Sequence, residues 1–143
     1  MKTASFFTYT GPGRISIARF APRRTPAGFR MFKSLAPGSW FNSVTPARYV
    51  ELFDKEILGV LDPRETWKQV HDLAGGAEPV LLCWEKPTDQ ESDPNAYCHR
   101  ALVARFFEKA LGEKVPEIGY ETAPRHPLLP QLVATDSQRS LFV

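Results

Sequence analysis

An uninterrupted apolar run over residues 80–84 (VLLCW) constrains the fold of this chain more than any other segment. An extended segment points its side chains alternately to the two faces of a sheet, so a run without a polar residue leaves neither face for water. Such a run is typical of a strand buried on both sides, as in a parallel sheet. We therefore predict an α/β fold, in which a mostly parallel sheet forms the middle of a small three-layer domain.

Local sequence signals elsewhere in the chain predict further strands for this sheet and helices to cover it. Pro46 directly after Thr45 is typical of a helix start, and Asp62 with Glu65 three residues later has the pattern of a capping box. Gly112 marks the end of the last helical segment. The predicted elements are strands over 4–9 and 14–20, helices that begin at Thr45 and Asp62, and a helix over 96–111 that is capped by Asn95.

Basic and acidic residues are unevenly distributed along the chain. Residues 1–50 contain eight lysines and arginines and no acidic residue, whereas the remaining 93 residues contain ten basic and sixteen acidic ones. Aromatic residues interleave with the basic ones, a combination that suits phosphates and stacked bases. We predict nucleic-acid contacts for Arg14, Arg23 and Arg24. The alternative, in which the basic segment folds against the acidic part and neutralises it, stays open.

Cysteine content and hydropathy bear on the compartment. Two cysteines are too few for a disulfide framework, which points to a reducing compartment. No apolar run has the length that is needed to cross a bilayer. An acid-free, arginine-rich start is also a feature of organelle transit peptides, but four prolines argue against the amphipathic helix of such a peptide. We expect a cytoplasmic protein that has no membrane partner.

The sharpest constellation of reactive residues joins the end of the apolar strand to the start of the last helix. Cys83 lies at the strand exit, and Cys98, His99 and Arg100 lie at the helix start. In open α/β sheets ligands bind at the carboxyl ends of the strands, and a helix N-terminus attracts anions. Arg100 would complete a phosphate site, Cys98 would be a thiolate, and His99 would act as its base.

A plainer interpretation applies to the same residues. Buried cysteine is a common small hydrophobic residue, and we favour core packing for Cys83. Cys98 would equally fit the inner face of the helix. A zinc site from Cys83, Cys98 and His99 is weaker still, because structural zinc usually draws on paired C-x-x-C spacings and none occurs here. We therefore predict no metal ligand, and no cofactor can be named from the sequence.

Residues 80–86 (VLLCWEK) followed by 98–104 (CHRALVA) resemble the hallmark of the Domain of Unknown Function 488 family. The segment from Ile15 to Arg19, the stretch 35–37 and the helix pair from Tyr49 to Pro63 also match its pattern. The resemblance covers residues 4 to about 120 and implies a compact α/β domain over 1–121, whose activity is not established. It maps the motif positions of the family onto Arg19, Cys83, Glu85, Cys98, His99 and Arg100. Arg19 is accordingly a second candidate for phosphate binding, and Glu85 a candidate for acid–base work.

The end of the chain carries a different signal. Residues 124–130 include three prolines and predict a linker, so we assign 122–143 to a flexible tail. Residues 138–142 (QRSLF) resemble the docking peptide of the bacterial DNA sliding clamp. In that reading Leu141 and Phe142 fill an apolar pocket of the clamp, while Gln138 and Ser140 complete the motif. The alternative is that the terminal residues pack onto the domain itself.

These observations leave three functional hypotheses. The first is an enzyme that is recruited to the sliding clamp and acts on DNA or nucleotides through the anion site at the helix start. The second is a non-enzymatic module that binds nucleic acid through its basic first segment. The third is a protein that only blocks access to the clamp.

Overall fold

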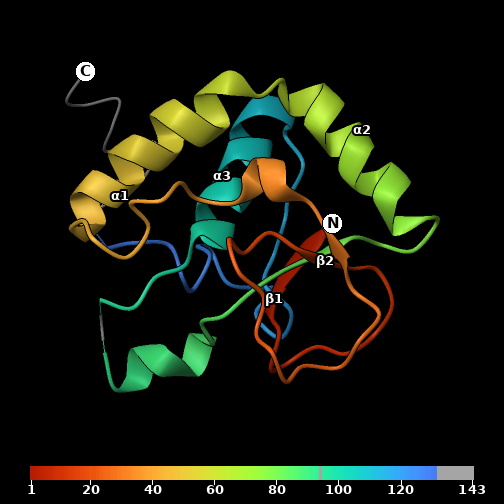
Figure 1. Ribbon diagram of the computed structural model, residues 1–143, viewed down its shortest axis with the longest axis horizontal. Coiled ribbons are helices and arrows are strands. Elements are labelled where there is room, and N and C mark those ends of the chain that lie inside the picture. Colours follow the sequence, from red (N-terminus) through yellow and green to blue (C-terminus); the bar gives the residue numbers. More distant parts are fainter. Residues whose placement is uncertain (94, 132–143) are drawn as a thin grey trace.

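The structure, a computed structural model, describes residues 1–93 and 95–131 (Figure 1). The predicted docking peptide at 138–142 therefore lies outside the described residues. The strands are β1 (Lys2–Ser5), β2 (Arg14–Ser16), β3 (Arg30–Met31) and β4 (Val80–Cys83). The helices are α1 (Pro46–Leu52), α2 (Pro63–Ala74) and α3 (His99–Leu111), together with the π turn Phe53–Ile57 and the 3-10 turns Lys33–Leu35, Leu58–Val60 and Pro87–Glu91.

The four strands form one sheet in the order β1-β4-β2-β3, and every neighbouring pair is parallel. The apolar run at 80–83 is the inner strand β4, and all four of its residues are buried. Leu81 packs into one core cluster, whereas Val80 and Leu82 pack into another on the opposite face. The predicted α/β class and the parallel sheet are confirmed, for the physical reason that the sequence indicated.

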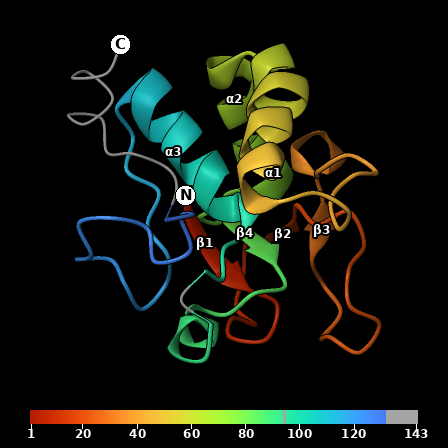
Figure 2. The same ribbon diagram turned by 90° about the vertical axis from the view of Figure 1, so that its left-hand side faces the viewer.

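The two faces of the sheet are covered in different ways. Figure 2 shows α1, α2 and α3 together on one side of the sheet, where residues of all three helices pack on Ile15, Ile17 and Leu81. The other face is closed by irregular segments, with Tyr9, Phe29 and Ile118 packed against the second cluster. The layers of the domain are therefore helices, sheet and loops.

The helix ends follow the predicted chemistry at most positions. Thr45 Oγ1 accepts a hydrogen bond from the amide of Arg48, and Asp62 Oδ2 accepts one from the amide of Glu65. At the third helix the prediction was wrong by three residues. The helix begins at His99 and its N-cap is Cys98, because the backbone before it runs extended to place Cys98 beside the sheet.

Other features differ from the predictions as well. The first strand is Lys2–Ser5 where 4–9 was predicted, and the second ends at Ser16 where residue 20 was predicted. The strand β3 lies where no strand was predicted, because its two residues carry too little pattern to be recognised. The domain also extends past residue 121, since Leu128 is fully buried in the second cluster and its carbonyl accepts a hydrogen bond from the Cys98 amide. The packed domain thus reaches into the segment that was assigned to the tail. Within the described residues, no helix is long and apolar enough to cross a membrane.

Candidate functional site

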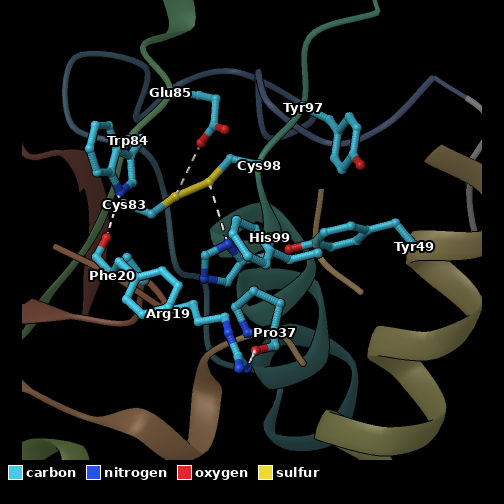
Figure 3. A pocket seen from close by; sticks show the side chains of 12 residues that line it. Arg19, Phe20, Pro37, Tyr49, Cys83, Trp84, Glu85, Tyr97, Cys98 and His99 are labelled. Carbon is cyan, nitrogen blue, oxygen red and sulfur yellow. Dashed lines mark hydrogen bonds between the residues drawn. A yellow bond between two sulfur atoms is a disulfide. The ribbon is translucent and has the colours of Figure 1, made fainter. Parts of the chain in front are cut away.

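A pocket of about 450 Å³ opens at the carboxyl ends of β2 and β4, beside the start of α3 (Figure 3). This is the edge where parallel α/β sheets bind ligands. The residues that follow β2 and β4 form two of its walls, and α1 contributes a third. Its lining consists of Ala18, Arg19, Phe20, Pro37, Phe41, Tyr49, Cys83, Trp84, Glu85, Tyr97, Cys98 and His99.

The two cysteines meet on the floor of this pocket. Cys83 ends β4, Cys98 caps α3, both are buried, and their sulfur atoms are joined in a disulfide. The pairing places the predicted nucleophile Cys98 beside the residue that we had assigned to core packing. Because the sulfurs are bonded, a thiolate at Cys98 requires prior reduction of the pair.

His99 is held in one orientation and one tautomer. Its Nε2 lies 2.7 Å from the backbone oxygen of Ile17, and because a carbonyl only accepts, Nε2 carries the proton. The unprotonated Nδ1 therefore faces Cys98 Sγ, 3.8 Å away. Burial lowers the pKa of His99 to about 4, and the positive charge of Arg100 acts in the same direction against the bond to Ile17. The imidazole is accordingly neutral at neutral pH.

Arg100 does not occupy the position that the phosphate-site hypothesis needs. The side chain is fully buried, and Glu117 accepts hydrogen bonds from its Nε at 2.9 Å and its Nη2 at 2.7 Å. The Nη2 atom also donates to the carbonyl of Glu85, and Nη1 donates to Cys83 Sγ at 3.2 Å. With its donors committed inside the protein, Arg100 positions the floor of the pocket and presents no face to a ligand.

Glu117 is the residue that sequence reasoning missed. Burial alone would raise its pKa, but hydrogen bonds from Arg100 and His126, the charge of Arg100 and a bond from Thr3 lower the pKa to about 2. The carboxylate is thus the permanent counter-charge of Arg100. It lies seventeen residues further along the chain, and no local motif connects the two.

Glu85 stands on the wall above the sulfur pair. Its Oε2 atom is 3.6 Å from Cys83 Sγ, and Figure 3 shows the carboxylate directed toward the sulfurs. Burial raises the pKa of Glu85, although a backbone hydrogen bond and the charge of Arg100 offset part of that effect. A carboxyl group with a raised pKa at a pocket wall suits acid–base work, which is the role predicted for Glu85.

The mouth of the pocket combines a cation with aromatic rings. Arg19 donates from Nη1 to the Pro37 carbonyl at 3.3 Å, and its guanidinium lies 5.6 Å from the ring centre of Phe20. The rings of Tyr49 and Tyr97 meet edge to face, with centroids 5.3 Å apart. Tyr49 was predicted only as part of the helix that begins at Thr45, and Tyr97 carried no signal except its place beside Cys98.

The other arginines with a predicted role lie away from the pocket. Arg14 donates to the carbonyls of Gly11, Pro26 and Ala27, so its guanidinium holds a loop together. Arg23 and Arg24 are exposed on the segment between β2 and β3. Of the predicted site residues, the structure brings together Arg19, Cys83, Glu85, Cys98 and His99 in the lining of one pocket, and Arg100 donates to Cys83 from outside that lining.

Comparison with known proteins gives no match to a protein-family model, to a curated protein or to a solved structure. The resemblance to the Domain of Unknown Function 488 family therefore stays a prediction.

Proposed function

We propose that this protein is an enzyme that acts on a nucleotide, or on an unpaired base of a nucleic acid, bound in the pocket at the ends of β2 and β4. The observation that carries the proposal is the composition of this pocket. One cation and several aromatic rings surround its mouth, a cysteine pair and a neutral histidine lie at its floor, and a carboxyl group with a raised pKa stands on the wall beside them.

The mouth of the pocket supports the proposal of a nucleotide ligand, because it offers a partner to the base and another to the phosphate. Any of the bases can stack on an aromatic side chain, and the aromatic residues Trp84 and Tyr97 line the pocket. A phosphate needs a positive charge, which Arg19 supplies. The hydrogen bond from Arg19 to Pro37 fixes the direction of the guanidinium before any ligand binds. A volume of about 450 Å³ lies within the range of small-molecule sites.

The floor supports chemistry on the bound ligand. Cys98, His99 and Glu85 all line the same pocket, and titratable groups with perturbed pKa values in a cleft are candidates for catalysis. We assign no phosphate contact to Arg100, because Glu117, Cys83 and the carbonyl of Glu85 hold its donors.

A binding experiment tests the pocket. Titration of nucleoside monophosphates and of short single-stranded DNA is followed by tryptophan fluorescence, to which Trp84 contributes from the pocket lining. Arg19→Ala should weaken binding about tenfold or more, because a hydrogen bond to a charged group contributes roughly 1.5 to 3 kcal/mol. Arg23→Ala removes the same charge from an exposed site outside the pocket and should leave the affinity unchanged. Equal effects of the two variants would contradict the proposal.

The proposal includes delivery of the enzyme to the sliding clamp by Gln138, Ser140, Leu141 and Phe142. Its support is the match of residues 138–142 to the docking pattern. Titration of purified clamp with the full chain should give a complex, and a chain that lacks residues 138–143 should give none. Binding that survives the deletion would exclude residues 138–142 as the docking site, and a full chain that gives no complex would remove the clamp from the proposal. Neither outcome bears on the ligand of the pocket.

A second candidate function is a non-enzymatic nucleic-acid module, and one observation favours it. Arg23, Arg24 and Arg30 are all exposed on the segment around β3. Such a module predicts that DNA affinity falls with salt, by about one unit of log–log slope for each basic group engaged. A double variant of Arg23 and Arg24 would then flatten the slope by about two units, whereas the enzyme hypothesis expects no change.

A further inference from the structure

We infer that Cys83, Cys98 and His99, once the two thiols are reduced, bind one zinc-type divalent metal ion on the floor of the pocket. This inference does not depend on a nucleotide as the ligand of the pocket, since it concerns only the three side chains and their surroundings.

The three ligand atoms already lie in one place. The two sulfurs and a ring nitrogen of His99 are all within 4.8 Å of one another, and the three residues are buried. Zinc binds sulfur at about 2.3 Å and nitrogen at about 2.0 Å, so tetrahedral ligand atoms are roughly 3.5 Å apart. The separation of 3.8 Å between His99 Nδ1 and Cys98 Sγ is close to this value. The two sulfurs, which the disulfide joins, have to separate before an ion can bind between them.

The backbone spacing of the cysteines favours a shared ion. The Cα atoms of Cys83 and Cys98 are 7.5 Å apart. Disulfides usually join Cα atoms that are about 4.4 to 6.8 Å apart, whereas a metal ion adds two bonds between the sulfurs and spans a wider gap. Cys83 is fixed by β4 and Cys98 by its backbone bond to Leu128, so the gap belongs to the fold.

His99 has the support that metal-binding histidines have. In such sites the ring nitrogen that does not bind the metal donates to a carboxylate or a backbone carbonyl, and this bond fixes the tautomer. Here Nε2 donates to the carbonyl of Ile17, at the end of β2. The free lone pair is therefore on Nδ1, the atom that faces the sulfurs.

The charges of a bound ion would also be balanced. Two thiolates neutralise a divalent cation, and a neutral cluster avoids the cost of an unpaired charge in the protein interior. Glu117 holds the charge of Arg100, while Arg100 Nη1 points at Cys83 Sγ from 3.2 Å. A thiolate is a much better acceptor for this donor than a neutral sulfur, so Arg100 stabilises Cys83 in the form that binds a metal.

Three protein ligands leave the fourth position of a tetrahedral ion for water. Three ligands and an open position are typical of catalytic zinc, whereas structural zinc has four protein ligands. All three residues line the pocket, and Figure 3 shows Glu85 approaching the sulfurs from the side opposite His99. A carboxylate beside a metal-bound water is placed to take up its proton. If the proposed function also holds, the reaction class is hydrolytic attack on the bound nucleotide or base.

Metal titration of the full chain tests the site without any nucleotide. Reduced protein should bind one Zn²⁺ per chain in competition with a chromophoric chelator, and the disulfide form should bind none. Cobalt(II) in place of zinc should show thiolate charge-transfer bands and the visible bands of a four-coordinate ion. Bound zinc should protect both thiols from alkylation. A reduced chain that binds no ion, or cobalt spectra without thiolate bands, would overturn the inference.

Variants separate the ligands from their neighbours. Cys98→Ser and His99→Gln should lose stoichiometric binding, and His99→Cys should recover it because a third thiolate replaces the imidazole. The matched control is His71→Gln, at a histidine on α2 that is not part of the pocket lining and whose Nδ1 lies 2.9 Å from the Trp67 carbonyl oxygen. This variant should still bind one ion. A Cys98→Ser variant that still binds one zinc ion per chain would contradict the site. If a variant folds poorly, the alkylation assay still tests zinc binding, because it uses the wild-type chain.

Discussion

Two polar regions meet at Arg100, and they differ in how their hydrogen bonds are used. On one side Glu117 binds Arg100, Thr3 Oγ1 donates to Glu117 at 2.6 Å, and His126 Nε2 lies 2.7 Å from the same hydroxyl. The members of this Glu117 cluster (Thr3, Arg100, Glu117 and His126) bond mainly to one another, and Glu117 and His126 also line a second pocket of about 390 Å³. On the other side, the cysteine pair, His99 and Glu85 line an open pocket.

The contrast separates a structural polar cluster from a reactive one. In the Glu117 cluster burial acts to raise the pKa of the carboxyl, but the hydrogen bonds from Arg100, His126 and Thr3 and the charge of Arg100 lower it to about 2. In the pocket, burial raises the pKa of Glu85 and lowers that of His99, so both groups are kept in an environment that disfavours their charge. Groups held in this way are typical of functional sites, where stability is given up for reactivity.

The largest effect that tests this contrast is expected at Glu117. Glu117→Gln keeps the shape of the side chain but leaves the buried guanidinium of Arg100 without a counter-charge. We expect a loss of about 3 to 5 kcal/mol in the free energy of unfolding, measured by chemical denaturation. Glu113→Gln, an exposed position near the end of α3, should change stability by less than about 0.5 kcal/mol. A loss of stability in Glu117→Gln as small as that of Glu113→Gln would mean that the buried ion pair contributes little to the stability of the fold.

The second effect is a dependence of stability on pH that originates in the same carboxyl. The pKa of Glu117 is about 2 in the folded state against an ordinary value of 4.5, so the unfolded chain binds the proton more tightly. Its contribution is therefore complete above pH 4.5 and is lost as the pH falls toward 2, by about 3 kcal/mol in all. Denaturation between pH 2 and 6 should show the difference between wild type and Glu117→Gln shrinking in acid. A constant difference would mean that another group dominates.

The sequence predicts the parallel sheet and the N-caps of α1 and α2 because these depend on neighbouring residues. The run at 80–84 indicates burial on both faces by itself, and Thr45 and Asp62 cap helices through amides three residues away. The meeting of Cys83 and Cys98 follows from the same logic, since a strand end and the next helix start share one edge of the sheet. This part of the site was within reach of sequence reasoning.

The partner of Arg100 was not within reach. An arginine in the first turn of a helix indicates an anion nearby, but the pattern does not say whether the anion is a ligand or a side chain from elsewhere in the chain. Thr3 and Glu117 are 114 residues apart, and they meet only because the segment after α3 returns along β1. Contacts of this kind depend on the complete fold. The position of Arg100 at a helix start therefore predicted a phosphate site, whereas the structure has an internal ion pair with Glu117.

The smallest effect completes the comparison of the two carboxyl groups beside Arg100. Glu85→Gln is the same substitution as Glu117→Gln, but at a group whose pKa is raised by burial. A raised carboxyl pKa means that the folded state disfavours the ionised form, so removal of the charge should leave stability unchanged or increase it by less than about 1 kcal/mol at neutral pH. Any gain should disappear in acid, where wild-type Glu85 is itself protonated. A loss of about 2 kcal/mol or more in the free energy of unfolding would mean that the Glu85 carboxylate stabilises the fold, as Glu117 does. The pocket would then lack the acid–base group on which the proposed chemistry depends.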